Sequence, residues 1–308
     1  MAYLSIIIPA NRDTASLEDA RVSGLTHRPE GCEILVPHAG TYDDPYGMAG
    51  EIALLDCDPR GTSSELVAQA IAAAQGELVH LLSPGCEVTS DWLESAIEQF
   101  DDPQVAAVSP LLEEESTGRI VMGVANGFAG GRREVTCQAK HVSSRRVQRG
   151  VIGPTSSAAF YRRSALDAIG GWPAEICLSL ADLDVALSLR EAGFERAIDT
   201  NCVIRVGEKR VYRTGAFGRA ASQERLFWRH RRSGMGRMLR PLVALAQCLG
   251  AGLPWSMAAA AMGKVASRGA KESGAAHRQR IADLAVELNA APAGDDVELE
   301  QPVRRAAA

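Results

Sequence analysis

Residues 76–88 read Gly76-Glu77-Leu78-Val79-His80-Leu81-Leu82-Ser83-Pro84-Gly85-Cys86-Glu87-Val88, and this stretch decides the fold. Residues 78–82 are apolar apart from one histidine, which is the pattern of a strand buried on both faces of a sheet. The Ser-Pro-Gly turn at 83–85 ends that strand. Because open α/β sheets bind ligands beyond the carboxyl ends of their strands, we expect residues 83–87 to lie at a binding edge.

Strand-like and helix-like runs alternate on either side of this stretch. Strands are predicted at Leu4–Ile8, Glu33–Val36, Ile52–Leu55, Leu78–Leu82 and Val105–Val108. Helices are predicted near Leu17–Leu25, Ser64–Gln75 and Asp91–Phe100. This alternation predicts an α/β fold, with a mostly parallel sheet flanked by helices.

Local signals predict where the helices begin and end. Thr62 and its polar neighbours can cap the helix that follows them, and Gly76 is expected to end it in the left-handed conformation. Ser90 and Asp91 open the next helix in the same way. Between Glu113 and Gly150 the periodicity fades, which predicts a hairpin or a long loop over the substrate face.

The second half of the chain changes from α/β to all-helical. A helix from Leu180 to Ala192, stopped by Gly193, and a strand around Cys202–Val206 complete a predicted α/β domain over residues 1–215. A helical extension is predicted over 216–289, and a disordered tail rich in Pro, Gly and acidic residues over 290–308. The extension is predicted to hold helices at Ala220–Arg232, Arg237–Leu249, Pro254–Arg268 and Ala275–Asn289.

Charge is unevenly distributed along the chain. The 308 residues carry a net charge of −5, which argues against general nucleic-acid binding. Yet the segment from Arg205 to Arg240 holds 11 Lys/Arg and 2 Asp/Glu, an excess of +9. Such a segment can meet phosphate on a nucleotide, a lipid diphosphate or an anionic membrane.

The uncharged span Pro241–Gly263 is 23 residues long, enough to cross a bilayer on length alone. Gly250, Gly252 and Pro254 interrupt it. We therefore expect two short helices that pack on the domain or lie at a membrane surface, rather than a spanning helix. The aromatic and basic run Arg225–Arg232 is read in the same two ways, as a helix packed on the domain or as a membrane contact.

The seven cysteines are odd in number and include no Cys-x-x-Cys pair, which favours reduced thiols over a disulfide framework or a zinc site. The N-terminus shows no signal peptide. We therefore expect a cytoplasmic protein, soluble or peripheral at the inner face of the membrane. The chain also lacks a Gly-x-Gly-x-x-Gly fingerprint and a Walker loop, which argues against a dinucleotide domain and a P-loop NTPase.

Three further motifs join the opening stretch in a resemblance to a known family. They are Ser5-Ile6-Ile7-Ile8-Pro9, the run from Gly153 to Trp172 with its small-residue turn and Gly170-Gly171-Trp172 corner, and Ala181-Asp182-Leu183-Asp184. Over about residues 3 to 206 the chain resembles the family-2 glycosyltransferases, which have the A-type fold. The resemblance implies transfer of a sugar from a nucleotide-sugar donor to a glycan or lipid-linked acceptor, with inversion at the anomeric carbon.

On the acceptor side, the resemblance implies that Asp182 is the catalytic base. A carboxylate within about 3 Å of an acceptor hydroxyl can take its proton, and the first turn of a helix favours an anion. The resemblance also implies that Arg162, Arg163, Trp172 and Asp184 shape the acceptor pocket. In the alternative interpretation, Asp182 and Asp184 cap their helix together with Ser179.

On the donor side, the chain departs from the family pattern. Where the family has carboxylates for the base and the metal, this chain has Pro37-His38 and Ser83-Pro84-Gly85. We assign donor contacts to Pro9, His38 and Ser83, and we take Glu87 as the remaining ligand for Mg²⁺ or Mn²⁺, which prefer oxygen ligands. Exposed charge at a strand end is the alternative for Glu87.

The basic residues Arg205 and Arg210, with Lys209 and Arg213, are candidates for holding a diphosphate without metal. A solvated basic surface is the alternative for them. The missing acids also leave a second functional interpretation open, a catalytically inactive transferase-like domain that binds a glycan or a partner protein.

Overall fold

The computed structural model describes residues 3–10, 14–40, 47, 50–90, 92–126, 133–138, 150–207, 215–231, 258, 261–263, 265–266 and 269–290. Its strands are β1 (Leu4–Ile7), β2 (Cys32–Ala39), β3 (Ala53–Cys57), β4 (Leu78–Leu82), β5 (Cys86–Glu87), β6 (Val105–Glu114), β7 (Arg119–Asn126), β8 (Arg133–Gln138), β9 (Ala158–Arg162) and β10 (Glu195–Val206). Its helices are α1 (Thr14–Thr26), α2 (Ser63–Ala73), α3 (Glu94–Glu98), α5 (Arg163–Ala168), α6 (Leu178–Ala192), α7 (Ala216–His230) and α10 (Ala270–Ala290), with a 3₁₀ turn, η2, at Gln99–Asp101.

The strands form one mixed sheet in the order β3-β2-β1-β4-β9-β6-β10-β5. Neighbouring pairs in β3-β2-β1-β4 are parallel, as is the pair of β6 and β10, whereas β9 runs antiparallel between β4 and β6. A hairpin of β7 and β8 extends from β6. The predicted α/β class and its mostly parallel sheet are confirmed.

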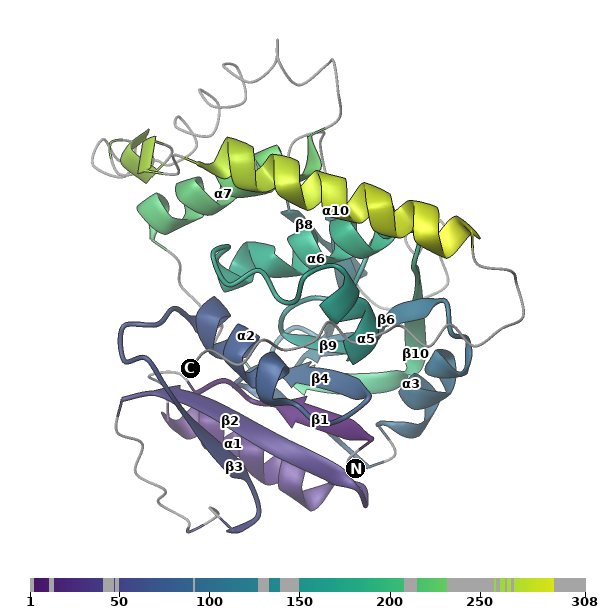
Figure 1. Ribbon diagram of the computed structural model, residues 1–308. Coiled ribbons are helices and arrows are strands. Elements are labelled where there is room, and N and C mark those ends of the chain that lie inside the picture. The colour runs from purple at the N-terminus through teal and green to yellow at the C-terminus, as the bar shows by residue number, and fades with distance from the viewer. Residues whose placement is uncertain are drawn as a thin grey trace, which may run out of the picture.

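Helices cover both faces of this sheet (Figure 1). Alternate residues of β1 point to opposite faces, so Ile6 packs in a core with α1 and α3, whereas Ile7 packs in a core with α2, α5 and α6. All five residues of β4 are buried, as the apolar run predicted for a central strand.

The predicted helix ends are confirmed in part. Thr62 and Glu65 form the expected capping box at the start of α2, with Thr62 N–H donating to Glu65 Oε2 at 2.6 Å. Gly193 ends α6 in the left-handed conformation, with φ of 103°. Gly76 does not end α2 in this way, because α2 ends at Ala73 and Gly76 lies against β1. A Cβ on Gly76 would lie 2.6 Å from the backbone nitrogen of Ser5.

The segment 113–150 contains the predicted hairpin, but β6 reaches six residues past its predicted end at Val108, to Glu114. β10 is also longer than predicted, because Glu195–Asp199 pair with β6 as well as Val203–Val206. Residues 127–132 and 139–149 lie outside the described residues.

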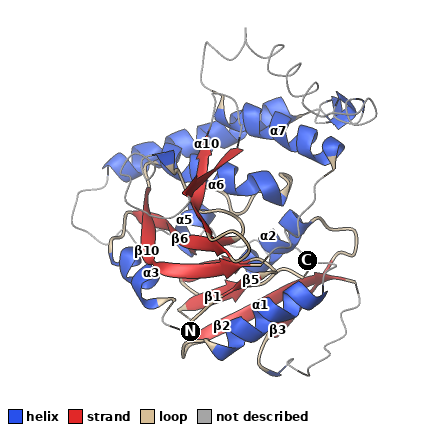
Figure 2. Cartoon of the chain, turned by 180° about the vertical axis from the view of Figure 1, so that it is seen from behind, coloured by secondary structure: helices blue, strands red, loops and turns tan. Residues whose placement is uncertain are grey.

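Two long C-terminal helices lie beside α6, and both views show α10 running across α7 (Figures 1 and 2). Ile281 and Leu284 of α10 are buried in the same core as α2 and α6. The predicted helix Arg237–Leu249, most of Pro254–Arg268 and the tail after Ala290 lie outside the described residues. The domain boundary at 215 stays a prediction. Among the helices that the structure describes, none is both long and apolar enough to cross a bilayer.

Candidate active site

The strands β1, β2 and β4 end at one edge of the sheet, and three predicted donor residues lie at or just beyond these strand ends. The pairing of β1 with β2 continues past Ile7, since Ala10 N–H donates to Pro37 O at 2.9 Å, and this encloses Pro9. His38 is the last residue but one of β2, with Nδ1 2.9 Å from the carbonyl oxygen of Gly40. Pro9, His38 and Ser83 therefore share the edge where such sheets bind ligands.

The turn after β4 is fixed by hydrogen bonds to residues 156–157. Ser83 N–H donates to Ser157 O at 2.8 Å, and Ser83 Oγ donates to Ser156 O at 2.7 Å. Gly85 has a φ of 79°, the left-handed conformation that glycine adopts most easily. Ser83 is buried and its hydroxyl is used within the fold, so it braces the turn.

Asp182 lies in the second turn of α6, one turn later than predicted, because the helix begins at Leu178. Its side chain is fully buried, yet its carboxylate is well supplied with donors. Arg133 Nε lies 2.9 Å from Oδ1 and Arg133 Nη2 lies 2.7 Å from Oδ2. The backbone N–H of Ser156 donates to Oδ2 at 2.9 Å, and that of Leu183 to Oδ1 at 2.8 Å. These donors satisfy the hydrogen-bonding capacity of the buried carboxylate.

Arg133 and Ser156 connect Asp182 to the sheet edge. The backbone of Ser156 accepts from the Ser83 hydroxyl through its carbonyl oxygen and donates to Asp182 through its N–H. Burial of Arg133 acts to lower its pKa, but the neighbouring Asp182 carboxylate outweighs this and raises the pKa. A continuous chain of hydrogen bonds therefore runs from the β4 turn through Ser156 to Asp182 and Arg133.

Asp184 faces the other side of α6. It is buried with one oxygen 2.9 Å from His230 Nε2 and 2.8 Å from Arg229 Nε, both on α7. Burial acts to raise its pKa, but the hydrogen bond and the charge of His230, with Arg229, lower it overall. On the other side of its ring, His230 Nδ1 lies 3.0 Å from Glu191 Oε2. Asp184 thus holds α7 against α6.

Arg162 and Arg163 do not lie with Asp182. β9 runs antiparallel to β4, so the end of β9 reaches the start of β4, at the sheet edge opposite Ser83. Arg162 donates to backbone carbonyls, including that of Phe100 at 2.7 Å, and Arg163 Nε donates to Gly76 O at 2.7 Å. These contacts are structural.

Trp172 is buried beneath the start of α2, where its Nε1 donates to Ser64 Oγ at 3.0 Å. Its ring meets Tyr161 edge to face, with centroids 6.1 Å apart. α2 begins at the edge of the sheet where ligands are expected. Trp172 therefore packs near that edge, unlike Arg162 and Arg163, which lie at the opposite edge.

Glu87 and Arg205 are opposite each other in the pairing of β5 with β10. Gly207 N–H donates to Gly85 O at 2.9 Å, so the chain after Arg205 leaves the sheet beside the β4 turn. Arg210, with Lys209 and Arg213, lies outside the described residues.

A metal site built from protein ligands does not fit the residues that the structure describes. They bring together no group of three or more His, Cys, Asp or Glu side chains. Glu87 would be one oxygen ligand, and a divalent cation takes about six. The assignment of Glu87 as a metal ligand stays a prediction.

Sequence reasoning missed Arg133 and Ser156. Arg133 lies in the segment that was predicted only as a hairpin or long loop; it begins β8, and its side chain is 21 % exposed. Ser156 acts through its backbone, which side-chain patterns do not reveal. The available signal was the small-residue turn after Gly153, since a Cβ on Gly153 would lie 2.5 Å from the Cβ of Ala186 in α6.

No family model and no curated protein matches the chain. Solved structures do resemble it. A mannosyltransferase from Pyrobaculum calidifontis in complex with GDP-Man and Mn²⁺ matches with a TM-score of 0.52 and 16% identity, over 92% of this chain and 86% of that one. GalNAc-T7, solved with UDP, GalNAc and Mn²⁺, matches with a TM-score of 0.56 and 10% identity over 73% of this chain.

The matched region spans 47% of the GalNAc-T7 chain. At these identities the likeness concerns the fold, and that fold is the A-type glycosyltransferase fold. The fold expected from the family resemblance is confirmed.

Proposed function

We propose that the protein is an inverting glycosyltransferase that moves a sugar from a nucleotide-sugar donor to a hydroxyl of a glycan or lipid-linked acceptor. The observation that carries the proposal is the buried Asp182 carboxylate, connected through the backbone of Ser156 to the β4 turn at the ligand edge of an A-type fold. Aspartate side chains are seldom fully buried, and a buried one beside the edge where such sheets bind ligands favours a chemical role.

In the proposed reaction, the acceptor oxygen attacks the anomeric carbon while its proton passes to Asp182. The bond between that carbon and the donor's diphosphate breaks, and the nucleoside diphosphate leaves with the electron pair. A base that takes the proton in the transition state typically contributes about 10²- to 10⁴-fold to the rate. Inversion follows from a single displacement and rests on the family resemblance.

The donor would lie along the edge formed by Pro9, His38 and the Ser83 turn. Arg205 stands beside this turn and is a proposed diphosphate contact, as is Arg210. The edge position of Pro9, His38 and Ser83 supports this part of the proposal more directly than their side chains do, since the hydroxyl of Ser83 is used within the fold.

The acceptor assignments stay predictions and have uneven support. Trp172 lies on the ligand side of the sheet but is buried, and Asp184 contacts α7. Arg162 and Arg163 bind backbone carbonyls at the far edge. We therefore place no acceptor contact on the two arginines.

A catalytically inactive binding domain is the second candidate. It is favoured by the absence of an acidic cluster among the described residues and by the full engagement of the Asp182 carboxylate. Calorimetry with UDP and GDP separates the two candidates, because an enzyme must bind a nucleoside diphosphate and a glycan-binding scaffold need not.

An assay of nucleoside diphosphate release tests the catalytic proposal. Purified protein is incubated with a panel of UDP- and GDP-sugars and with glycan or lipid-linked acceptors, in Mg²⁺, in Mn²⁺ and without added metal. We expect release with one donor and its loss in Asp182→Asn. No release from any donor, or an Asp182→Asn variant as fast as the wild type, would reject it.

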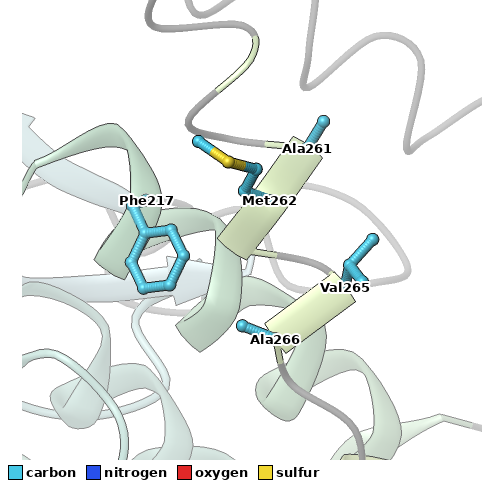
Figure 3. Close-up of a pocket in the computed structure, with 5 residues that line it drawn as sticks. All are labelled: Phe217, Ala261, Met262, Val265 and Ala266. Carbon is cyan, nitrogen blue, oxygen red and sulfur yellow. The ribbon is translucent and has the colours of Figure 1, made fainter.

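We also propose that the face around Phe217 contacts an anionic membrane at its cytoplasmic side. Phe217, Met262 and Val265 are 47, 59 and 61 % exposed and, with Ala261 and Ala266, line an open pocket of about 580 Å³ (Figure 3). Phe217 belongs to the segment Arg205–Arg240, which has a net charge of +9 in the sequence, and exposed apolar side chains in a basic segment suit anionic lipid.

A further inference from the structure

The Asp182 carboxylate cannot accept a proton from a substrate in the arrangement that the structure shows. A carboxylate offers about four lone-pair positions. Two N–H groups of Arg133 and the backbone N–H groups of Ser156 and Leu183 occupy all of them. A base needs a free lone pair directed at the hydroxyl, so one of these donors must leave before the reaction.

Arg133 is the donor that can leave. The other two N–H groups belong to the backbone, one to α6 itself and one to the segment that braces the β4 turn. Arg133 reaches Asp182 with a flexible side chain from the start of β8, and 21 % of that side chain is exposed. Rotation of this side chain would uncover one edge of the carboxylate without moving the sheet.

A diphosphate is the ligand that suits the released guanidinium. Arginine binds phosphate oxygens with two parallel N–H bonds, the same geometry that it uses here with Asp182. The guanidinium is separated from the turn at the carboxyl end of β4 by the Asp182 carboxylate and the backbone of Ser156. The described residues bring together no group of three or more metal-ligating side chains, so a nearby guanidinium would help to neutralise the charge of a diphosphate.

We propose that Arg133 exchanges partners during the reaction, holding Asp182 in the free protein and the donor's diphosphate in the complex. This inference rests on the proposed function. Donor binding would then free Asp182 to act as the base, and Arg133, protonated throughout, would stabilise the charge that develops on the leaving diphosphate. The acceptor would react only after the donor is bound, because Asp182 is not available as a base before then.

Calorimetric titration with UDP and with GDP, with and without Mn²⁺, tests this exchange. We expect Arg133→Gln to weaken binding about ten- to a hundredfold, the usual effect of losing a charge-assisted hydrogen-bonded pair. Arg133→Lys should recover part of the affinity, because it keeps the charge but not the two parallel bonds. Arg119→Gln is the matched control, since Arg119 is an exposed arginine on the same hairpin.

Nucleotide binding by Asp182→Asn is the decisive measurement in this titration. Asparagine holds a guanidinium less strongly than a carboxylate does, so the variant should bind the nucleotide about two- to tenfold more tightly than the wild type. If Arg133 merely anchored the hairpin, both substitutions would weaken nucleotide binding or neither would. Asp182→Asn would then not bind the nucleotide more tightly.

Equal affinities of the wild type, Arg133→Gln and Asp182→Asn, with all three folded by circular dichroism, would overturn the exchange and leave the transferase proposal standing. If the wild type binds neither UDP nor GDP, the transferase proposal fails and the exchange fails with it. Tighter binding by Asp182→Asn together with weaker binding by Arg133→Gln supports both.

Discussion

A histidine in the central strand should make the fold sensitive to acid. His80 of β4 is fully buried, with its ring centroid 4.0 Å from that of Phe160 and 4.8 Å from that of Trp92. Neither ring nitrogen makes a well-formed hydrogen bond to a residue that the structure describes. Burial lowers the pKa of this imidazole to about 3, and the backbone of Ala159 offsets only part of that effect.

The direction and size of the effect follow from linkage. The folded pKa lies below the ordinary value near 6.5, so the unfolded chain binds the proton more tightly. The contribution of His80 to stability is complete above pH 6.5 and is lost as the pH falls toward 3. At pH 5 the loss is about 2 kcal/mol, from 1.5 pH units at about 1.4 kcal/mol each.

Urea unfolding at pH 7.5 and pH 5.0 measures this loss. We expect His80→Phe to lose about 2 kcal/mol less than the wild type between the two pH values. Because phenylalanine is larger and can strain the core, His80→Leu is the companion variant, and the difference between pH values is compared rather than the absolute stability. If both variants lose as much stability as the wild type, His80 is not the acid-sensitive group and the reasoning is wrong.

Four further results are expected. Asp182→Asn should slow sugar transfer at least about a hundredfold in the release assay, and a wild-type rate would exclude it as the base. Glu87→Gln should change UDP affinity equally with and without Mn²⁺, because Glu87 belongs to no group of three or more possible metal ligands among the described residues; a loss confined to Mn²⁺ would instead make it a ligand. His230→Ala should lower the unfolding free energy by about 1–3 kcal/mol at pH 6 and by less at pH 9, because the histidine has a raised pKa and its contribution is lost as pH rises; equal losses in urea titrations would contradict this. Phe217→Glu should weaken flotation with phosphatidylserine vesicles, whereas Val286→Glu, at a 70 % exposed site on α10, should not; equal flotation would reject the membrane face.

The sheet could be predicted from sequence because its strands carry strong local patterns. The apolar run Leu78–Leu82 was predicted with its observed ends, since a strand buried on both faces needs apolar residues on both. β10 was predicted too short because most of residues 195–201 are exposed or half-buried without a regular alternation, and pairing with β6 rather than composition makes Glu195–Asp199 a strand. Gly76 was assigned to a helix end, although the constraint on it comes from β1, 71 residues earlier.

The site was less predictable than the sheet because its key contacts join distant segments. The ion pair of Arg133 with Asp182 spans 49 residues, and the contact of Ser156 with Asp182 spans 26. Neither contact corresponds to a sequence spacing that a motif would reveal. The sequence does contain Asp182 itself, at a helix position that the family resemblance identifies.

Asp182 and Asp184 show why two acids in one motif need separate arguments. Two residues along a helix correspond to about 200° of rotation, so the two side chains leave α6 on opposite sides. One reaches Ser156 and Arg133 near the sheet edge, and the other reaches His230 and Arg229 of α7. The first is a candidate for chemistry because the proposed ligand-binding edge lies beside it, whereas the second is held among helices. Replacing Asp184 should therefore act on the attachment of α7, and replacing Asp182 should act on the reaction.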